Sequence, residues 1–367
     1  MRVTLEDVCE KGSSNLKQSD VINKTGAYPI YGAAGYLGNV DFYHQDKPYV
    51  AVVKDGAGIG RTTLHPAKSS VIGTMQYLLP KNNVLPEYLY YVVQYMHLEK
   101  YFTGATIPHI YFKDYKAEQF NLDAIERQKE IVASLQKVET LIKARQQQLQ
   151  KLDELIKARF VELFGDMFLN SKAWEERPLD LLAEVVSGIT KGRKTKEPQL
   201  TEVPYMAVSN VKDGYIDWTT VKTIQATQQE IEQYRLLPDD VLMTEGGDPD
   251  KLGRGAILKE PLENCIHQNH IFRVRLNESL ILPTFFAEYL KHQKAKRYFL
   301  GCAKQTTGIA SINMRQLKAL PVLLPPLELQ VQFASFVKQV DKSKVAVQKS
   351  LDEAQLLFDS LMQQYFG

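Results

Sequence analysis

The chain repeats itself, and this internal duplication constrains its fold more than any other feature of the sequence. Gln128 aligns with Gln330 at an offset of 202 residues, and the same offset superimposes the two FG dipeptides that close the aligned tails. Nearer the N-terminus the offset is 197, which places Leu85-Pro86 on Leu282-Pro283. Further upstream, VTLEDVCEKG resembles RPLDLLAEVVSG. The chain therefore divides into two similar halves, each a globular segment followed by a helical tail.

Both tails carry apolar residues spaced alternately four and three positions apart, which predicts a coiled-coil seam. The apolar stripe is narrow and needs a covering partner, so we expect the two tails to cover each other. Antiparallel pairing is the economical arrangement, because the intervening globular segment then leaves and re-enters at one end of the pair. The expected seam consists of Ile131, Leu135, Val138, Ile142, Leu149, Leu152, Ile156, Phe333, Val337, Val340, Val347, Leu351, Phe358 and Leu361.

Two basic residues, Arg145 and Lys344, occupy seam positions near the middle of the tails. Their long side chains either extend to solvent while the stems cover apolar surface, or form a polar layer that sets the register. The sequence leaves both interpretations open. Antiparallel pairing would place a pseudo-twofold axis across the middle of the pair, with one globular segment toward each end.

The globular segments alternate short strands with helices, so the expected fold class is mixed α/β (α+β), built as a pseudo-twofold internal repeat. We expect four parts. Residues 1–122 and 167–324 would form two similar α/β domains. Residues 123–166 and 325–367 would form the long antiparallel coiled-coil helices that separate them.

Composition argues against several classes of protein. The three cysteines, Cys9, Cys265 and Cys302, form no CxxC motif, so neither a disulfide framework nor a zinc site is expected. A reducing compartment, the cytoplasm, is the better expectation. No apolar run has the length of a signal-peptide core or a membrane span. The formal net charge of +2 identifies no partner by itself.

No catalytic or metal-binding set stands out. The GAGIG stretch lacks the following helix and acidic residue of a dinucleotide site, and no GxxxxGK[ST] motif occurs. The histidines lack metal-ligand spacing, and His267 and His270 are expected to be surface or strand residues. We therefore expect no metal and no catalytic residue, which favours a binding or scaffolding role.

Each half contains a strand followed by a glycine-rich loop that ends in an arginine, Arg61 or Arg254. Such loops can enter a DNA groove, where Arg reads guanine, Asn and Gln read adenine, and Thr contacts thymine methyl groups. Nearby lysines would neutralise phosphates. Taken singly, each of these residues could equally be an ordinary solvated one. The candidate DNA-binding residues are Tyr31, Tyr36, Lys54, Arg61, Thr62, Lys68, Gln76, Lys191, Arg193, Lys194, Lys196, Asn210, Lys212, Lys251, Arg254, Gln268, Asn269 and Gln305.

The sequence resembles the specificity (S) subunit of type I restriction–modification enzymes. The resemblance rests on TTGIASINMRQLKALPVLLPPLELQ (306–330) at the junction of recognition domain and helix, with FNLDAIERQKEIVASL as its first-half equivalent. RPLDLLAEVVSGITKGRK, followed by VPYMAVSNV, is similar to the opening of a target-recognition domain, and DDVLMTEGG is similar to a later part. The order recognition domain, helix, recognition domain, helix covers the whole chain. The first half departs from the pattern, with NLDAIERQ in place of LPPLE.

The resemblance implies a non-catalytic subunit that confers DNA sequence specificity on a type I restriction–modification complex. Each target-recognition domain would read one half of a bipartite, asymmetric site, and the helices would fix the unread spacer. If both domains approach one face of the duplex, the half-site centres should lie about one turn, roughly 10 bp, apart. The implied partners are double-stranded DNA, two modification (methyltransferase) subunits and restriction (translocase/nuclease) subunits. S-adenosylmethionine and ATP would bind to those partners, so no cofactor is expected on this chain.

Two other functions stay open on the sequence. One is a coiled-coil scaffold without a DNA role, and the other is a DNA methyltransferase with unrecognised catalytic motifs. A steep loss of DNA affinity with added salt would exclude the scaffold. Methylation of DNA by the chain without any partner would support the enzyme.

Overall fold

The computed structural model describes residues 1–104, 108–194, 199–248, 252–306 and 309–367, with the backbone alone described at 305, 306 and 309. The chain forms two compact units. The first unit consists of Met1–Gln147 and Val347–Gly367, and the second of Gln148–Ala346. Two helices of 40 residues, α4 (Ile125–Phe164) and α9 (Leu327–Phe366), contribute one part to each unit.

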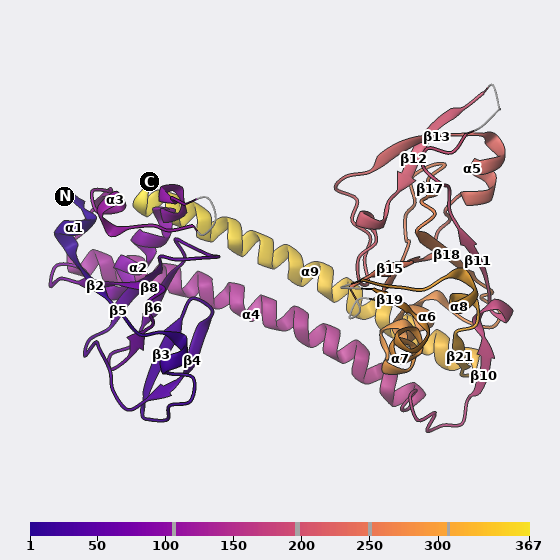
Figure 1. Cartoon of the computed structure of the whole chain (residues 1–367), viewed down its shortest axis with the longest axis horizontal. Coiled ribbons are helices and arrows are strands. Elements are labelled where there is room, and N and C mark those ends of the chain that lie inside the picture. Colours follow the sequence, from indigo (N-terminus) through magenta and orange to yellow (C-terminus); the bar gives the residue numbers. More distant parts are fainter. Residues whose placement is uncertain (105–107, 195–198, 249–251, 307–308) are drawn as a thin grey trace. The chain divides into compact units, whose positions relative to one another are not determined.

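The first unit is built on a four-stranded antiparallel sheet with the strand order β2-β8-β5-β6. A smaller sheet has the order β4-β3-β7, with β3 and β7 parallel, and β1 pairs with β9. The elements, most of which are labelled in Figure 1, are β1 (Arg2–Thr4), α1 (Leu5–Val8), β2 (Cys9–Ser13), β3 (Tyr28–Gly32), β4 (Gly35–Val40), β5 (Tyr49–Val53), β6 (Thr62–His65), β7 (Ser70–Val71), β8 (Met75–Pro80), α2 (Pro86–Tyr95), α3 (Phe112–Tyr115) and β9 (Gln119–Asn121).

The second unit repeats this plan. Its four-stranded antiparallel sheet has the order β11-β18-β14-β16, its smaller sheet the order β13-β12-β17, and β10 pairs with β21. The elements are β10 (Glu175–Pro178), β11 (Ala183–Ser187), β12 (Thr201–Met206), β13 (Lys222–Ala226), α5 (Gln228–Tyr234), β14 (Val241–Thr244), β15 (Gly246–Gly247), β16 (Gly255–Ile257), β17 (Ile266–His267), β18 (Ile271–Leu276), α6 (Pro283–Lys291), α7 (Gln293–Cys302), β19 (Lys304–Thr306), β20 (Ile309–Ser311), α8 (Met314–Lys318) and β21 (Pro321–Leu324).

The matching strand orders confirm the predicted duplication and the mixed α/β class. In both smaller sheets the outer pairing is parallel, β3 with β7 and β12 with β17. The units differ in their helices, since α5 of the second unit has no counterpart in the described part of the first, and they also differ in one set of strands. The second unit adds the sheet β15-β20-β19, where the described part of the first unit has only the isolated bridges Asp55↔His109 and Thr103↔His109.

A buried glutamine joins each long helix to its unit. The Gln128 side chain donates to the carbonyls of Asn83 and Asp123 at 3.0 and 2.9 Å and accepts from the Leu85 N–H at 2.9 Å. Gln330 makes the equivalent bonds to Leu280, Pro325 and Leu282 at 3.1, 2.9 and 2.9 Å. Both glutamines are 0% exposed. The two residues that defined the repeat in the sequence thus have the same structural role, since buried polar groups must be paired.

Helix boundaries follow ordinary start and stop signals. Helices α2 and α6 begin at Pro86 and Pro283, where the missing N–H and the fixed φ of proline suit a first helical turn. Helix α4 ends before Gly165, which has a φ of +78° and donates its N–H to the Val161 carbonyl at 2.8 Å. Glycine adopts this left-handed conformation without the steric penalty of a Cβ atom.

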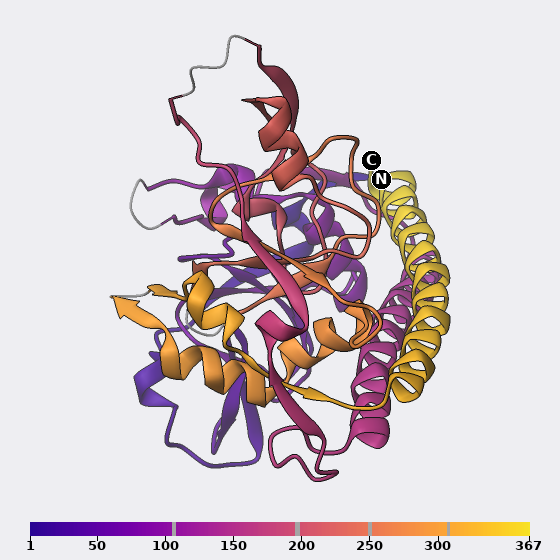
Figure 2. The ribbon, with the colours of Figure 1, turned by 90° about the vertical axis from the view of Figure 1, so that its right-hand side faces the viewer.

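The two long helices run in opposite directions within each unit, as predicted (Figure 1; Figure 2). In the first unit, the Arg127 guanidinium lies 5.8 Å from the Tyr365 ring centroid, and the Arg145 Nε donates to Ser350 Oγ at 3.1 Å. In the second unit, Asp153 pairs with Lys344 at 2.5 Å, and the Arg159 guanidinium lies 5.7 Å from the Phe336 ring centroid. In both units, rising residue numbers on α4 therefore meet falling numbers on α9.

The mid-helix basic residues both bond to the opposite helix. Arg145 is half-buried and reaches Ser350, and Lys344 reaches Asp153. These contacts favour the polar-layer interpretation over simple extension into solvent. Polar contacts across a seam fix register more than they add stability.

The seam positions expected from the heptads are all buried or half-buried in the structure. Ile131, Leu135, Val138, Ile156, Phe333, Val340, Val347 and Phe358 are buried, and Ile142, Leu149, Leu152, Val337, Leu351 and Leu361 are half-buried. In the second unit, the rings of Phe160 and Phe164 pack against Phe333 with centroids 5.3 and 5.6 Å apart. The helix pair therefore belongs to the hydrophobic core of each unit.

Candidate nucleic-acid interface

In the first unit, the glycine-rich loop between β5 and β6 turns through three glycines with positive φ: Gly56, Gly58 and Gly60. Arg61 at its end is exposed, and its guanidinium donates to the Ala33 carbonyl in the β3–β4 turn. Thr62 Oγ1 donates to the Gly60 carbonyl at 3.2 Å. The loop is a compact projection whose arginine remains accessible to solvent.

The β3–β4 hairpin of the same unit presents an exposed aromatic ring. Tyr36 is 62% exposed, and its hydroxyl donates to Asn39 Oδ1 at 2.9 Å. Tyr31 is half-buried, 4.3 Å from the His65 ring and 6.0 Å from the Tyr36 ring. Burial raises the pKa of Tyr31 above its usual value. Tyr36 can therefore stack on a base, with Tyr31 as its support, and Lys68 is also exposed.

Four lysines line one hollow of the first unit, with a volume of about 340 Å³. We call it the lysine cleft, formed by Lys11 of β2, Lys54 after β5, and Lys113 and Lys116 at α3. Lys54 pairs with Asp55 at 3.7 Å, and Lys116 with Glu6 at 2.7 Å. Gln76 also lines the cleft but is 4% exposed and accepts a bond from the Tyr115 hydroxyl. An excess of positive charge around a hollow suits a phosphate backbone.

In the second unit, Arg193 is engaged within the fold. Its guanidinium forms a two-point ion pair with Glu230 and donates to the Gln225 carbonyl at 3.0 Å. This pairing raises the pKa of Arg193 and lowers that of Glu230. Arg193 therefore stabilises the fold of the second unit, and its guanidinium is occupied by this pairing and not by the phosphate contact expected from the sequence. Lys191 and Lys194 are exposed, and Lys196 lies outside the described residues.

Asn210 is an interior residue, which corrects its expected place at a DNA surface. It is 3% exposed, its Oδ1 accepts from the Ala207 N–H at 2.9 Å, and its Nδ2 donates to two carbonyls in the 217–220 loop at 2.8 and 2.9 Å. A short polar side chain that satisfies local backbone groups in this way fixes a turn. Gln268 and Asn269 are half-buried beside β18.

Arg254 follows the glycine-rich loop of the second unit and is half-buried. Its Nε is buried, and among the described residues no group accepts a hydrogen bond from it. Lys212 lies 3.8 Å from Asp217. Lys251 and the side chain of Gln305 lie outside the described residues. Among the described residues, the Nε atoms of Arg159 and Arg273 are buried without a hydrogen-bond partner in the same way as that of Arg254. The place of Arg254 at the end of the glycine-rich loop, and not this nitrogen, is therefore what makes it a candidate for a base contact.

Several basic residues at this surface were missed by the sequence reasoning. Lys11, Lys113 and Lys116 line the lysine cleft, yet none lies in a glycine-rich loop. A signal was present, because the offset of 202 aligns Lys113 with Arg315 and Lys116 with Lys318. Basic residues therefore occupy both of these positions in each half of the duplication.

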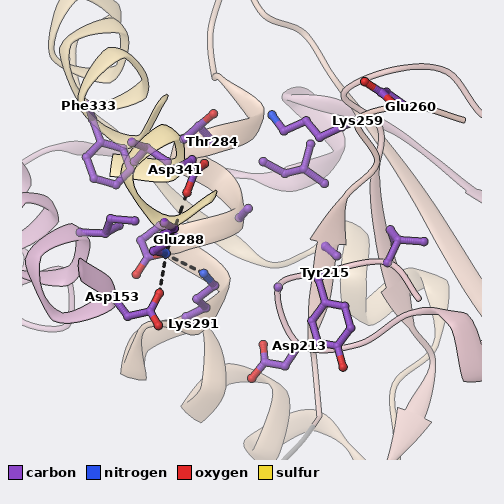
Figure 3. A pocket seen from close by; sticks show the side chains of 18 of the residues that line it. Asp153, Asp213, Tyr215, Lys259, Glu260, Thr284, Glu288, Lys291, Phe333 and Asp341 are labelled. Atoms are coloured by element: carbon purple, nitrogen blue, oxygen red, sulfur yellow. Dashed lines mark hydrogen bonds and ion pairs between the residues drawn. The ribbon is translucent and has the colours of Figure 1, made fainter. Parts of the chain in front are cut away.

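A second cleft, in the second unit, has a different charge (Figure 3). It measures about 540 Å³ and lies beside α6 and the start of α9. Lys344 pairs here with Asp153 and Asp341, and Lys291 pairs with Glu288. Its carboxylates outnumber its lysines: Asp153, Asp213, Glu260, Glu288 and Asp341 against Lys259, Lys291 and Lys344. The net negative charge of this cleft repels phosphate, so the cleft does not belong to the candidate DNA interface.

Buried His267 should make the second unit sensitive to acid. Burial, reinforced by the charge of Arg273, lowers its pKa to about 3. The unfolded chain takes up a proton near pH 6.5, whereas the folded chain does not until about pH 3. The free energy of unfolding should therefore fall as the pH drops through this window, by up to about 1.4 kcal/mol per pH unit. The expected strand residue is confirmed at His267, which ends β17 and is 0% exposed.

Urea denaturation at several pH values can check this prediction through tryptophan fluorescence, because both tryptophans, Trp174 and Trp218, belong to the second unit. His267→Gln should flatten the dependence of stability on pH. A variant with a slope as steep as that of the parent protein would contradict the assignment.

The described parts of the chain contain no cluster of three or more His, Cys, Asp or Glu side chains that could hold a metal ion. Within those same parts, no helix is long and apolar enough to cross a membrane.

The observed arrangement defines a class of protein: a duplicated α/β protein whose two units share a pair of antiparallel helices. A family model described as the type I restriction modification DNA specificity domain matches residues 1–154 and 171–354. The chain belongs to this family, which confirms the resemblance found in its sequence.

Individual relatives agree with this assignment. The chain is 28% identical over 194 residues to the putative type I restriction enzyme MjaX specificity subunit of Methanocaldococcus jannaschii, covering 53% of this chain and 45% of that protein. It is 24% identical over 162 residues to the type I restriction enzyme EcoKI specificity subunit of Escherichia coli, covering 44% and 35%. The chain thus spans less than half the length of these curated relatives.

Solved structures share the fold over the full chain. The S subunit of a type I restriction–modification system from M. genitalium has a TM-score of 0.61 and 16% identity, covering 100% of this chain and 96% of that one. A chain from a structure concerned with complex assembly and conformational transition of the type I R-M system has a TM-score of 0.56 and 14% identity, covering 100% and 97%.

Proposed function

We propose that this chain is the DNA sequence-specificity subunit of a type I restriction–modification complex and reads a bipartite, asymmetric site. Residues 1–122 and 167–324 act as target-recognition domains, and residues 123–166 and 325–367 as the spacer helices between them. The observation that carries the proposal is the duplication itself: one architecture occurs twice, with different side chains around it. A protein that reads two different half-sites needs a shared scaffold and separate readers.

The outer faces of the helices support docking of two copies of one partner. Leu155 on α4 and Leu357 on α9 are related by the repeat offset of 202 and are 47% and 48% exposed. Single exposed apolar side chains are common on protein surfaces, so the support for docking lies in their recurrence at repeat-related positions of the two helices. Two modification subunits fit this duplication, and restriction subunits join them. In this arrangement S-adenosylmethionine and ATP bind to the partners, and the chain contributes specificity without catalysis.

Mapping of methylated adenines by the complex of this chain with its modification subunits tests the proposal. The expected result is one bipartite motif. Arg254→Ala should weaken one half-site by about 10- to 100-fold, because loss of a base contact costs about 1–3 kcal/mol, and should leave the other half intact. Lys259→Ala, an exposed lysine of the same unit paired with Asp239, is the matched control. Methylation by the chain alone, or equal loss on both halves, would contradict the proposal.

The spacer of the recognised site should change with helix length. Insertion of one heptad into both α4, after Gln147, and α9, after Ala346, adds about 10 Å of helix and keeps the seam in phase. The unread spacer should then lengthen by about 3 bp, at about 3.4 Å per base pair. Sequencing of methylated sites measures this directly. Insertion into one helix alone should abolish assembly, and an unchanged spacer after the double insertion would refute a ruler.

A further inference from the structure

The two units place non-identical side chains at the same backbone positions of the candidate interface. In the first unit, the Ile110 N–H donates to the Lys54 carbonyl at 2.9 Å. In the second, the Ile312 N–H donates to the Glu245 carbonyl at 2.9 Å. Residues 110 and 312 differ by the repeat offset of 202. Lys54 and Glu245 are therefore structural equivalents, each directly after the second strand of its large sheet.

A neighbouring pair is equivalent by the same criterion. The Lys54 N–H donates to the Thr74 carbonyl at 3.0 Å, and the Glu245 N–H donates to the His270 carbonyl at 3.0 Å. Thr74 directly precedes β8, and His270 directly precedes β18, so both lie at the start of the last strand of the large sheet in chain order. At this equivalent position the first unit carries Lys54 and the second unit carries Glu245, so the two units have opposite charges there.

A second set of positions keeps its charge. Helices α3 and α8 lie at the same point of the repeat, before the strands β9 and β21. Lys113 and Arg315 are both exposed on these helices, and Lys116 and Lys318 follow one turn later as half-buried residues. Basic residues recur at both positions, although the two residues between them differ.

We propose that these two sets of residues have different roles in DNA recognition. Lys113, Lys116, Arg315 and Lys318 bind phosphates in both half-sites. Lys54 and Glu245 contact bases and make the two half-sites different in sequence. This inference rests on the proposed function. It assigns the base-reading role to the start of each loop, in addition to the arginines that end it.

The chemistry of DNA explains the division. Phosphates are identical at every step, so contacts to them stay positive when a reader domain is duplicated and diverges. Base edges differ, and a lysine donates to guanine O6 and N7, whereas a carboxylate accepts from the cytosine N4 amine. A carboxylate on a phosphate-facing surface is otherwise unfavourable, because like charges repel. Recognition of a base would explain why a carboxylate, Glu245, occupies this surface.

The local geometry suits both readers. Lys54 is 31% exposed at the rim of the lysine cleft. The Glu245 side chain is 33% exposed, and its Oε2 lies 2.5 Å from His270 Nδ1. That bond uses one carboxylate oxygen and orients the other. A side chain held in place by a neighbour loses less conformational freedom when it binds a base.

The experiment uses the complex of the full chain with its modification subunits and measures DNA affinity against salt and the methylated motif. Lys113→Gln and Arg315→Gln should each reduce the slope of log affinity against log salt by about 1 and leave the motif unchanged. Lys47→Gln, an exposed lysine of the first unit outside the cleft, should leave the slope unchanged. Lys54→Glu should change base preference by about 10- to 100-fold at one position of one half-site.

Glu245→Lys should alter the other half-site alone. If this variant melts earlier than the parent protein, Glu245→Gln decides instead, because it keeps the shape and one accepting oxygen and should relax the preference for cytosine. Unchanged motifs for Lys54→Glu and both Glu245 variants, or unchanged salt slopes for Lys113→Gln and Arg315→Gln, would overturn the inference while a bipartite motif of the parent complex upholds the proposed function. A parent complex without a bipartite motif or salt dependence would remove the proposed function itself.

Discussion

Replacement of Phe333 by alanine should lower the free energy of unfolding of the second unit by about 3–5 kcal/mol, the usual cost of removing a buried aromatic ring. Phe333 is 0% exposed near the start of α9. Its ring packs against Phe160 and Phe164 of α4, so truncation to alanine removes the aromatic contacts of both rings. The change therefore loosens the helix pair where it joins the second unit.

Urea denaturation followed by tryptophan fluorescence measures this effect, because Trp174 Nε1 donates to the Phe164 carbonyl at 2.9 Å and so reports on the affected cluster. Val331→Ala, at a position 53% exposed two residues earlier on the same helix, is the matched control and should cost less than about 0.5 kcal/mol. Similar losses for the two variants would contradict the packing argument.

Gln330→Leu should destabilise the second unit by about 3 kcal/mol, because it leaves the Leu282 N–H and the carbonyls of Leu280 and Pro325 without their partner. Leucine restores the apolar volume but none of the hydrogen bonds. The repeat predicts the same loss for Gln128→Leu in the first unit, where Leu85 loses its acceptor. Each change should act on its own unit.

Amide hydrogen exchange separates the two effects. Exchange at Leu282 should accelerate in Gln330→Leu, and exchange at Leu85 in Gln128→Leu. Gln332→Leu alters an exposed glutamine on the same helix and should leave both amides protected. Equal protection in all three variants would show that the glutamines are dispensable.

The duplication and the antiparallel helices were predictable because both rest on patterns repeated along the sequence. Seven-residue periodicity marks a helix seam by itself, and the offset that aligns Gln128 with Gln330 also aligns their hydrogen bonds. Pairing direction followed from chain connectivity. Both predictions can be made without knowing which side chains, distant in the sequence, are in contact in the fold.

Individual contact residues were harder to predict, because their roles depend on partners far apart in the sequence. Arg193 resembles a free basic residue until Glu230, on α5, is brought against it. Asn210 resembles a base reader until the 217–220 loop folds around it. The lysine cleft is formed by β2, the end of β5 and α3, which are far apart in the sequence. No local sequence pattern predicts that these three segments lie next to one another.

Domain boundaries illustrate the same point. The sequence suggests that helices begin where domains end, and α4 and α9 do begin at Ile125 and Leu327. The compact units nevertheless divide within both helices, near residues 147 and 347. The heptad periodicity continues without interruption through these points, so it does not predict which half of each helix packs against which unit.

The first unit depends on the end of α9. Phe358, Met362 and Phe366 belong to the same buried cluster as Tyr88 and Leu135. Residues up to Phe366 must therefore be synthesised before the N-terminal segment can close its hydrophobic core. We expect a product that lacks Phe358, Met362 and Phe366 to expose this core, which would make it a target for cellular quality control before it associates with a partner.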